Sequence, residues 1–130
     1  MSRQVVVGPP AGPDGAPRPF SNAVRAGDLV FVSGQMATDT DGAFSGASIE
    51  VQAREVLDRI KAILAAAGLG LEDVVQCTCW IDDSRDFARF DAVWREYFPG
   101  EPPARSTVVA KLVMDAKLEV EAIAYAAATR

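Results

Sequence analysis

The sequence predicts an α/β fold of the α+β type, with a single mixed sheet of about six strands and two helices on one face of the sheet. Three observations lead to this prediction. The chain has 130 residues, which is the usual length of one domain. Hydrophobic residues make up 49% of it and charged residues 24%, enough to form a core without disulfides or metals. Two amphipathic segments interrupt a series of short β-rich ones. We therefore treat residues 1–130 as a single domain.

The first part of the chain predicts three strands and two loops. Gln4–Val7 is a short β-rich segment, and the Gly/Pro-rich Gly8–Pro19 that follows is typical of a loop. Ser21–Val24 and Asp28–Gln35 are the next two predicted strands. The polar segment Met36–Ala47 contains two glycines and is predicted to be a loop.

The segment Ser48–Ala67 predicts a helix. Ser48 can cap its start, and Gly68 can adopt the left-handed backbone that closes a helix. Apolar residues recur along it at helical spacing and form one stripe. They are Val56, Leu57, Ile60, Ile63, Leu64 and Ala67.

The segment Asp73–Ile81 predicts a strand. Alternation places Val75, Cys77, Cys79 and Ile81 on one face of it. The two cysteines are too far apart on one extended segment to form a disulfide easily, so we expect small, buried, reduced side chains.

A second helix is predicted over Arg85–Phe98, with Ser84 as its cap, and Pro99–Pro103 ends it. Its apolar stripe is largely aromatic and is typical of a core rather than of a platform for stacking bases. Ala104–Lys111 and Leu118–Ala126 are the last two predicted strands. The aromatic stripe comprises Phe87, Phe90, Val93, Trp94, Tyr97 and Phe98.

Two helices can cover only one face of such a sheet, so the other face needs a cover as well. The last strand is aliphatic on one side, which favours a sheet face that associates with another copy of the chain. The aliphatic residues are Leu118, Val120, Ala122, Ala124 and Ala126.

Charge and composition exclude several functions. The net charge of −5 disfavours a surface that follows nucleic-acid phosphates. The absence of histidine removes the usual general base and the commonest metal ligand, and no zinc or nucleotide-binding spacing is present. We therefore expect no metal and no cofactor. The N-terminus lacks the apolar run of a signal peptide, and no segment reaches the roughly 18 apolar residues of a membrane span, so we expect a soluble cytoplasmic protein.

Arg105 is the first candidate site residue. It stands in the phrase Pro-Pro-Ala-Arg-Ser-Thr at the start of a predicted strand. Its planar guanidinium matches a carboxylate at two points, although a surface ion pair would place an arginine there equally well.

Two further segments are candidates. Glu119 and Glu121 lie two residues apart and share one face of the last strand. They face solvent, or one of them polarises a water for attack on a C=N bond. Ser33 and Gly34 close a predicted strand, where glycine serves a tight turn or lets the backbone approach a ligand.

Taken in order, phrases over nearly the whole chain resemble the Rid (YjgF-like) family. Each is unspecific alone, but the ordered set is highly specific. They are Pro19–Val24, Gly27–Gln35, Gln52, Ile63–Gly68, Asp73–Val75, Asp86–Phe87, Tyr97–Phe98, Pro103–Ser106 and Glu119–Ala124.

The resemblance implies a chorismate-mutase-like fold, a homotrimer whose sheets form a central barrel, and sites in the clefts between subunits. Deaminating members of the family hydrolyse reactive 2-imino acids, the tautomers of enamines such as 2-aminoacrylate, without a cofactor. Arg105 falls on the carboxylate-binding arginine and Glu119 on the glutamate that positions water. The segment between them is one residue shorter here, so Glu121 stays an alternative. Ser33 and Gly34 fall on the loop that lines the pocket.

Three site positions depart from the family pattern. Phe20 replaces a tyrosine, Thr107 a cysteine and Asp91 an asparagine, and these changes point to a side branch with its own substrate. Two alternatives to a deaminase remain open: a non-catalytic binder of small carboxylates, and the ribonuclease role of some relatives. The acidic charge and missing histidine count against the ribonuclease.

Overall fold

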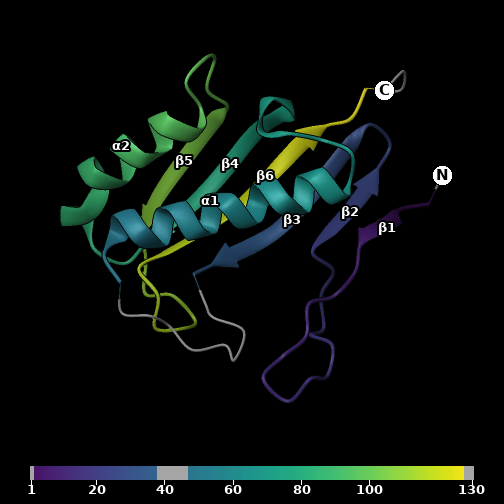
Figure 1. The fold of residues 1–130 in the computed structure, drawn as a ribbon, viewed down its shortest axis with the longest axis horizontal. Coiled ribbons are helices and arrows are strands. Elements are labelled where there is room, and N and C mark those ends of the chain that lie inside the picture. The colour runs from purple at the N-terminus through teal and green to yellow at the C-terminus, as the bar shows by residue number, and fades with distance from the viewer. Residues whose placement is uncertain (1, 38–46, 128–130) are drawn as a thin grey trace.

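The computed structural model describes residues 2–37 and 47–127 and confirms the predicted fold class. Six strands form one mixed sheet in the order β1-β2-β3-β6-β4-β5, and two α-helices pack on it (Figure 1). The strands are β1 (Gln4–Val7), β2 (Ala23–Ala26), β3 (Leu29–Met36), β4 (Val74–Ile81), β5 (Ala104–Val109) and β6 (Leu118–Tyr125); the helices are α1 (Ile49–Ala66) and α2 (Phe87–Tyr97).

Neighbouring strands are antiparallel except for β4 and β5, which are parallel. This pair is connected through α2, because parallel neighbours need a crossover connection. The ladder between β3 and β6 shifts register between Val32 and Gln35, so Ser33 and Gly34 lie in an irregularity of β3. The predicted Gly8–Pro19 loop projects beyond the sheet between β1 and β2 (Figure 1).

Both ends of α1 follow from local chemistry. The backbone N–H of Val51 donates to Ser48 Oγ at 3.3 Å, which makes Ser48 the N-cap as predicted. Gly68 has a φ of 78°, so its lack of a side chain lets the chain turn out of the helix. The predicted loop Met36–Ala47 falls mostly outside the described residues, and Met36 itself belongs to β3.

The predicted start of α2 was wrong by two residues, and Ser84 does not cap it. A short 3-10 turn over Ser84–Asp86 precedes the helix. Asp83 caps this turn, because its Oδ1 accepts from the backbone N–H of Arg85 at 2.9 Å. Two cap-competent residues stand side by side here, and the chain uses the first.

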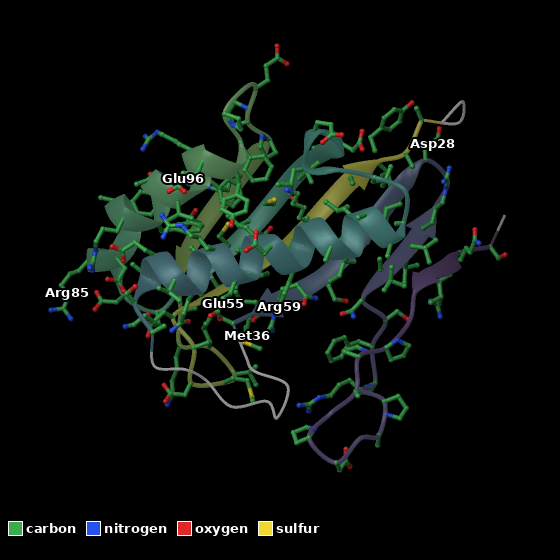
Figure 2. The ribbon with its side chains drawn as sticks, viewed as in Figure 1. Asp28, Met36, Glu55, Arg59, Arg85 and Glu96 are labelled. Carbon is green, nitrogen blue, oxygen red and sulfur yellow. The ribbon has the colours of Figure 1, made fainter. Side chains whose placement is uncertain are left out.

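Both helices lie on one face of the sheet (Figure 1). An ion pair between Arg54 and Glu96 at 2.8 Å joins α1 to α2, and Figure 2 labels Glu96 on its helix. Arg59 of α1 donates to the carbonyl of Met36 at 2.5 Å and fastens the helix to the end of β3 (Figure 2). Among the described residues, no helix is both long and apolar enough to cross a lipid bilayer.

The core lies between the helices and the sheet. The aliphatic side of β6 faces this core, so the prediction that it forms the uncovered face was wrong. Alternation also fails at the start of β4, where a register shift buries Val74 and leaves Val75 45% exposed. The uncovered face instead carries several exposed apolar residues: Leu29, Phe31, Val108 and Tyr125.

Candidate functional site

Arg105 and Thr107 point to the helix-covered side of the sheet. Arg105 pairs with Cys77 and Thr107 with Cys79 in the parallel ladder, and both cysteines are buried under the helices. Neighbours across a sheet share a face, so the same side of β5 meets α2.

Aromatic rings of α2 hold the Arg105 guanidinium. Its central carbon lies 4.9 Å from the ring centroid of Trp94, 5.3 Å from that of Phe90 and 5.6 Å from that of Phe87. These distances are within the range of cation–π attraction. Part of the stripe predicted to be core therefore also fixes a cation. The spacing of three and four residues along one helix face was its only sequence signal.

Asp91 of α2 forms an ion pair with Arg105. Arg105 Nη2 donates to Asp91 Oδ1 at 2.7 Å, and the two side chains are only 18% and 24% exposed. Both line a groove of about 450 Å³ with Trp94, Phe98 and the Pro-rich turn that follows α2. This volume falls in the range of small-molecule sites. A groove of about 690 Å³ beside residues 109–116 contains none of the predicted site residues.

Thr107 and the two cysteines lie behind Arg105. The hydroxyl of Thr107 is buried without a hydrogen-bond partner among the described residues, and Thr107 lies opposite Cys79 in the ladder between β4 and β5. Burial dominates, and it raises the pKa of Cys77 and of Cys79 to about 12 against the charge of Arg105. Both thiols are therefore protonated at neutral pH and cannot serve as nucleophiles.

Glu119 lies on the uncovered face of the sheet. It pairs with Trp80 of β4 and Met36 of β3, and its carboxylate rests against the backbone of Gly34. A Cβ on Gly34 would come within 2.1 Å of Glu119 Oε2, so only glycine leaves room for this carboxylate. The requirement is steric, because Gly34 does not have a positive φ.

Burial raises the pKa of Glu119, and the nearby charge of Glu121 adds to the effect. Among the described residues, nothing donates a hydrogen bond to the Glu119 carboxylate. A carboxyl group that keeps its proton to a higher pH is suited to exchanging protons with water or a substrate. Glu121 lies farther along the same face, opposite Thr78.

Ser33 connects β3 to the segment before β2. Its Oγ donates to the carbonyl of Ser21 at 2.6 Å, and its N–H donates to the carbonyl of Asn22 at 2.9 Å. The hydroxyl therefore has a structural partner. Phe20, next to this segment, is 46% exposed.

The predicted site residues form two groups in one chain. Arg105, Asp91 and Thr107 are together at the β5 edge on the helix-covered side. Ser33, Gly34 and Glu119 are together on the uncovered side. The two groups face opposite sides of the sheet. Strand β4 also lies between β5 and β6, so the groups are two strand spacings, about 10 Å, apart within the plane of the sheet. A small molecule cannot touch both groups of one chain.

Among the described residues, no group of three or more His, Cys, Asp and Glu side chains is placed to hold a metal ion. The charged side chains lining the 450 Å³ groove are Asp91, Arg95 and Arg105. The arrangement can bind a carboxylate at Arg105 and exchange protons at Glu119.

A family model described as Endoribonuclease L-PSP matches residues 13–126. A RutC family protein of Pyrococcus horikoshii is 44% identical over 109 residues, which cover 82% of this chain and 86% of the relative. An Escherichia coli protein named "Putative reactive intermediate deaminase TdcF" is 40% identical over 118 residues, covering 88% and 92%.

Solved structures agree with these matches. The yeast protein YEO7 superimposes with a TM-score of 0.85 at 32% identity, covering 97% of this chain and 100% of that protein. The E. coli TdcF structure, solved with bound serine, superimposes with a TM-score of 0.78 at 38% identity, covering 90% and 93%.

Proposed function

The chain belongs to the Rid (YjgF-like) family, and from this premise we propose that it hydrolyses reactive 2-imino or enamine carboxylates to the oxo compound and ammonia. The reaction needs water and no cofactor. A member of the family at 40% identity carries the name of a reactive intermediate deaminase, which supports this class of reaction.

The observation that carries the proposal is the setting of Arg105. Its side chain is mostly buried, its guanidinium packs against three aromatic rings of α2, and the residue lines a groove. A surface ion pair needs none of these features, whereas a ligand carboxylate needs a fixed, partly desolvated two-point partner. The TdcF structure contains bound serine, which carries a carboxylate group, and this supports carboxylate binding as the role of Arg105.

Glu119 is the proposed proton carrier. In this role it accepts a proton from the water that attacks the imine carbon and returns it to the departing nitrogen. Its raised pKa and its unpaired carboxylate fit this task. Glu121 is the alternative, since it shares the face and lies two residues away.

Because Arg105 and Glu119 face opposite sides of one sheet, the proposal places the complete site between copies. The Arg105 groove of one chain would meet the uncovered face of the next, and a homotrimer closes such head-to-tail contacts into a ring. The exposed apolar residues Leu29, Phe31 and Tyr125 supply surface for that contact.

The direct test is an ammonia-release assay with imino acids generated in the cuvette by an amino-acid oxidase. The wild-type chain should accelerate release well above the spontaneous rate. Release at the spontaneous rate for every imino acid tried would reject the deaminase and leave a carboxylate binder.

A mixing experiment tests the shared site. Arg105→Ala and Glu119→Gln chains, each with little activity alone, are unfolded together and refolded as mixed assemblies. Sites built from two chains should regain about one quarter of wild-type activity, because that fraction pairs an intact Arg105 with an intact Glu119. No recovery in verified mixed trimers would contradict the shared site.

The matching family model is described as Endoribonuclease L-PSP, which makes RNA cleavage the second candidate. The net charge of −5 and the lack of histidine speak against it. Salt-dependent binding to RNA together with cleavage that co-purifies with the chain would favour it over the deaminase.

A further inference from the structure

Asp91 introduces a negative charge at the point where the proposed function places a substrate carboxylate. Its Oδ1 lies 2.7 Å from Arg105 Nη2, and both side chains are largely removed from solvent. The ion pair is one wall of the groove, so a ligand that reaches Arg105 also reaches Asp91.

The pair is neutral as a unit, and this changes what Arg105 attracts. A carboxylate that binds to the remaining N–H groups of Arg105 comes close to the Asp91 carboxylate. Like charges repel strongly where water is partly excluded, so a simple anion is bound less well than beside an uncharged acceptor. Arg95, the other cation lining the groove, is exposed and screened by solvent.

A ligand avoids this repulsion when it carries its own positive charge next to its carboxylate. We infer that Asp91 makes the site select carboxylates with a cationic nitrogen on the adjacent carbon, namely the protonated form of a 2-imino acid. This inference rests on the proposed function of the same site. In such a ligand a single carbon joins the nitrogen to the carboxylate, so the carboxylate can face Arg105 while the nitrogen faces Asp91.

The selected form is also the reactive one. Water adds to the carbon of C=NH₂⁺, forming a C–O bond while the π electrons move to nitrogen. One proton then passes from the added oxygen to nitrogen and makes it a leaving group. The C–N bond breaks as the carbonyl forms, the second proton of the added water passes from oxygen to the departing NH₃, and the products are the oxo acid and NH₄⁺. Atoms and charge balance with water as the only co-reactant. The nitrogen is positive in the bound iminium, and it is positive again in the protonated carbinolamine and in the ammonium product, so Asp91 faces a positive nitrogen at the start and at the end of the reaction.

The competing interpretation is that Asp91 only orients Arg105. The variant Asp91→Asn distinguishes selection by charge from simple orientation of Arg105. The asparagine Oδ1 still accepts the hydrogen bond from Arg105, but the negative charge is gone. The matched control is Asp28→Asn. Asp28 also pairs with an arginine, Arg25, but lies at the β2–β3 turn (labelled in Figure 2), and its replacement changes the net charge equally.

The test is calorimetric titration with two stable probes of the same carbon skeleton, 2-aminobutyrate and butyrate. The wild type should bind the zwitterion at least about tenfold more tightly, the size of one charge-assisted hydrogen bond. Asp91→Asn should bring the ratio close to one by weakening aminobutyrate and strengthening butyrate. Asp28→Asn should behave like the wild type.

The outcomes separate the two proposals. Equal wild-type affinities, or a preference retained in Asp91→Asn, would overturn selection by Asp91 and leave carboxylate binding at Arg105 standing. Binding of neither probe to the wild type would overturn both. Selection by Asp91 is also tested when imine turnover is absent, because the titration does not depend on catalysis.

Discussion

Gly34→Ala should disable the proposed proton carrier without altering the chain around it. The new Cβ would lie 2.1 Å from Glu119 Oε2, 2.9 Å from Cδ and 3.2 Å from Cγ. Restoring ordinary contact requires the carboxylate to move by about 1 Å or more. A displacement of that size at a reacting group costs about a hundredfold in rate, so kcat/KM for ammonia release should fall by roughly that factor.

The fold should tolerate the same change. Gly34 has no positive φ, and the atoms that must yield belong to the end of a flexible side chain. Alanine also restricts the unfolded chain, which stabilises by about 0.4–1 kcal/mol and offsets part of the crowding. Thermal unfolding should therefore occur within about 5 °C of wild type.

The assay compares four variants with the wild type: Gly34→Ala, Gly8→Ala, Glu119→Gln and the double variant of Gly34→Ala with Glu119→Gln. Gly8→Ala is the matched control, because no atom lies within 4 Å of a Cβ built there, and its kinetics should be unchanged. In a Glu119→Gln background, Gly34→Ala should lower kcat/KM by less than about a further twofold. The effects of substitutions at residues that act as a unit are not additive. Full activity in Gly34→Ala, or losses that multiply in the double variant, would refute the assignment of Glu119.

Three further predictions concern the same site. Arg105→Lys should lose about ten- to a hundredfold in kcat/KM, because an ammonium cannot reproduce the two-point contact, and Arg105→Ala should lose more while both stay folded by circular dichroism; an unfolded alanine variant would make Arg105 structural. Ammonia release should survive dialysis against a chelator, and loss of activity restored by one metal would contradict the expected metal-free site. The folded chain holds the Glu119 proton more tightly than the unfolded chain, so the free energy of unfolding should fall as pH rises from the ordinary glutamate range through the raised pKa of Glu119. Urea unfolding at a series of pH values should show this fall in the wild type and a weaker one in Glu119→Gln; identical profiles would contradict it.

The elements that could be predicted from the sequence are those fixed by neighbours along the chain. Gln4–Val7 matches β1, and α1 is correct within one residue at each end because Ser48 and Gly68 terminate it locally. The start of α2 could not be predicted, because Asp83 and Ser84 are both good caps. The chain uses Asp83 to cap a 3-10 turn, and α2 then begins without a side-chain cap of its own.

Faces of the sheet were harder to predict than its strands. A single-residue irregularity exchanges the sides of Val74 and Val75, and no periodic pattern reveals it. The side on which Arg105 emerges depends on its parallel register with Cys77. The sequence therefore yields the site residues as one set, whereas one chain separates them across its sheet.

The pairing of Asp91 with Arg105 could not be predicted from the sequence either. The sequence marks Asp91 as an added charge near the expected pocket, but contact between a helix and a strand depends on their packing. Only the assembled α2–β5 unit shows that the charge is placed on the guanidinium itself.

The two protonated thiols have a consequence for a protein that handles electrophiles. Burial raises the pKa of each thiol to about 12, so both stay protonated at pH 7. The sequence contains only these two cysteines, and Thr107 stands where the family pattern places another. An electrophilic carbon of the proposed substrate, held at Arg105, would therefore meet no thiolate of this chain, and the protein would resist inactivation by that substrate.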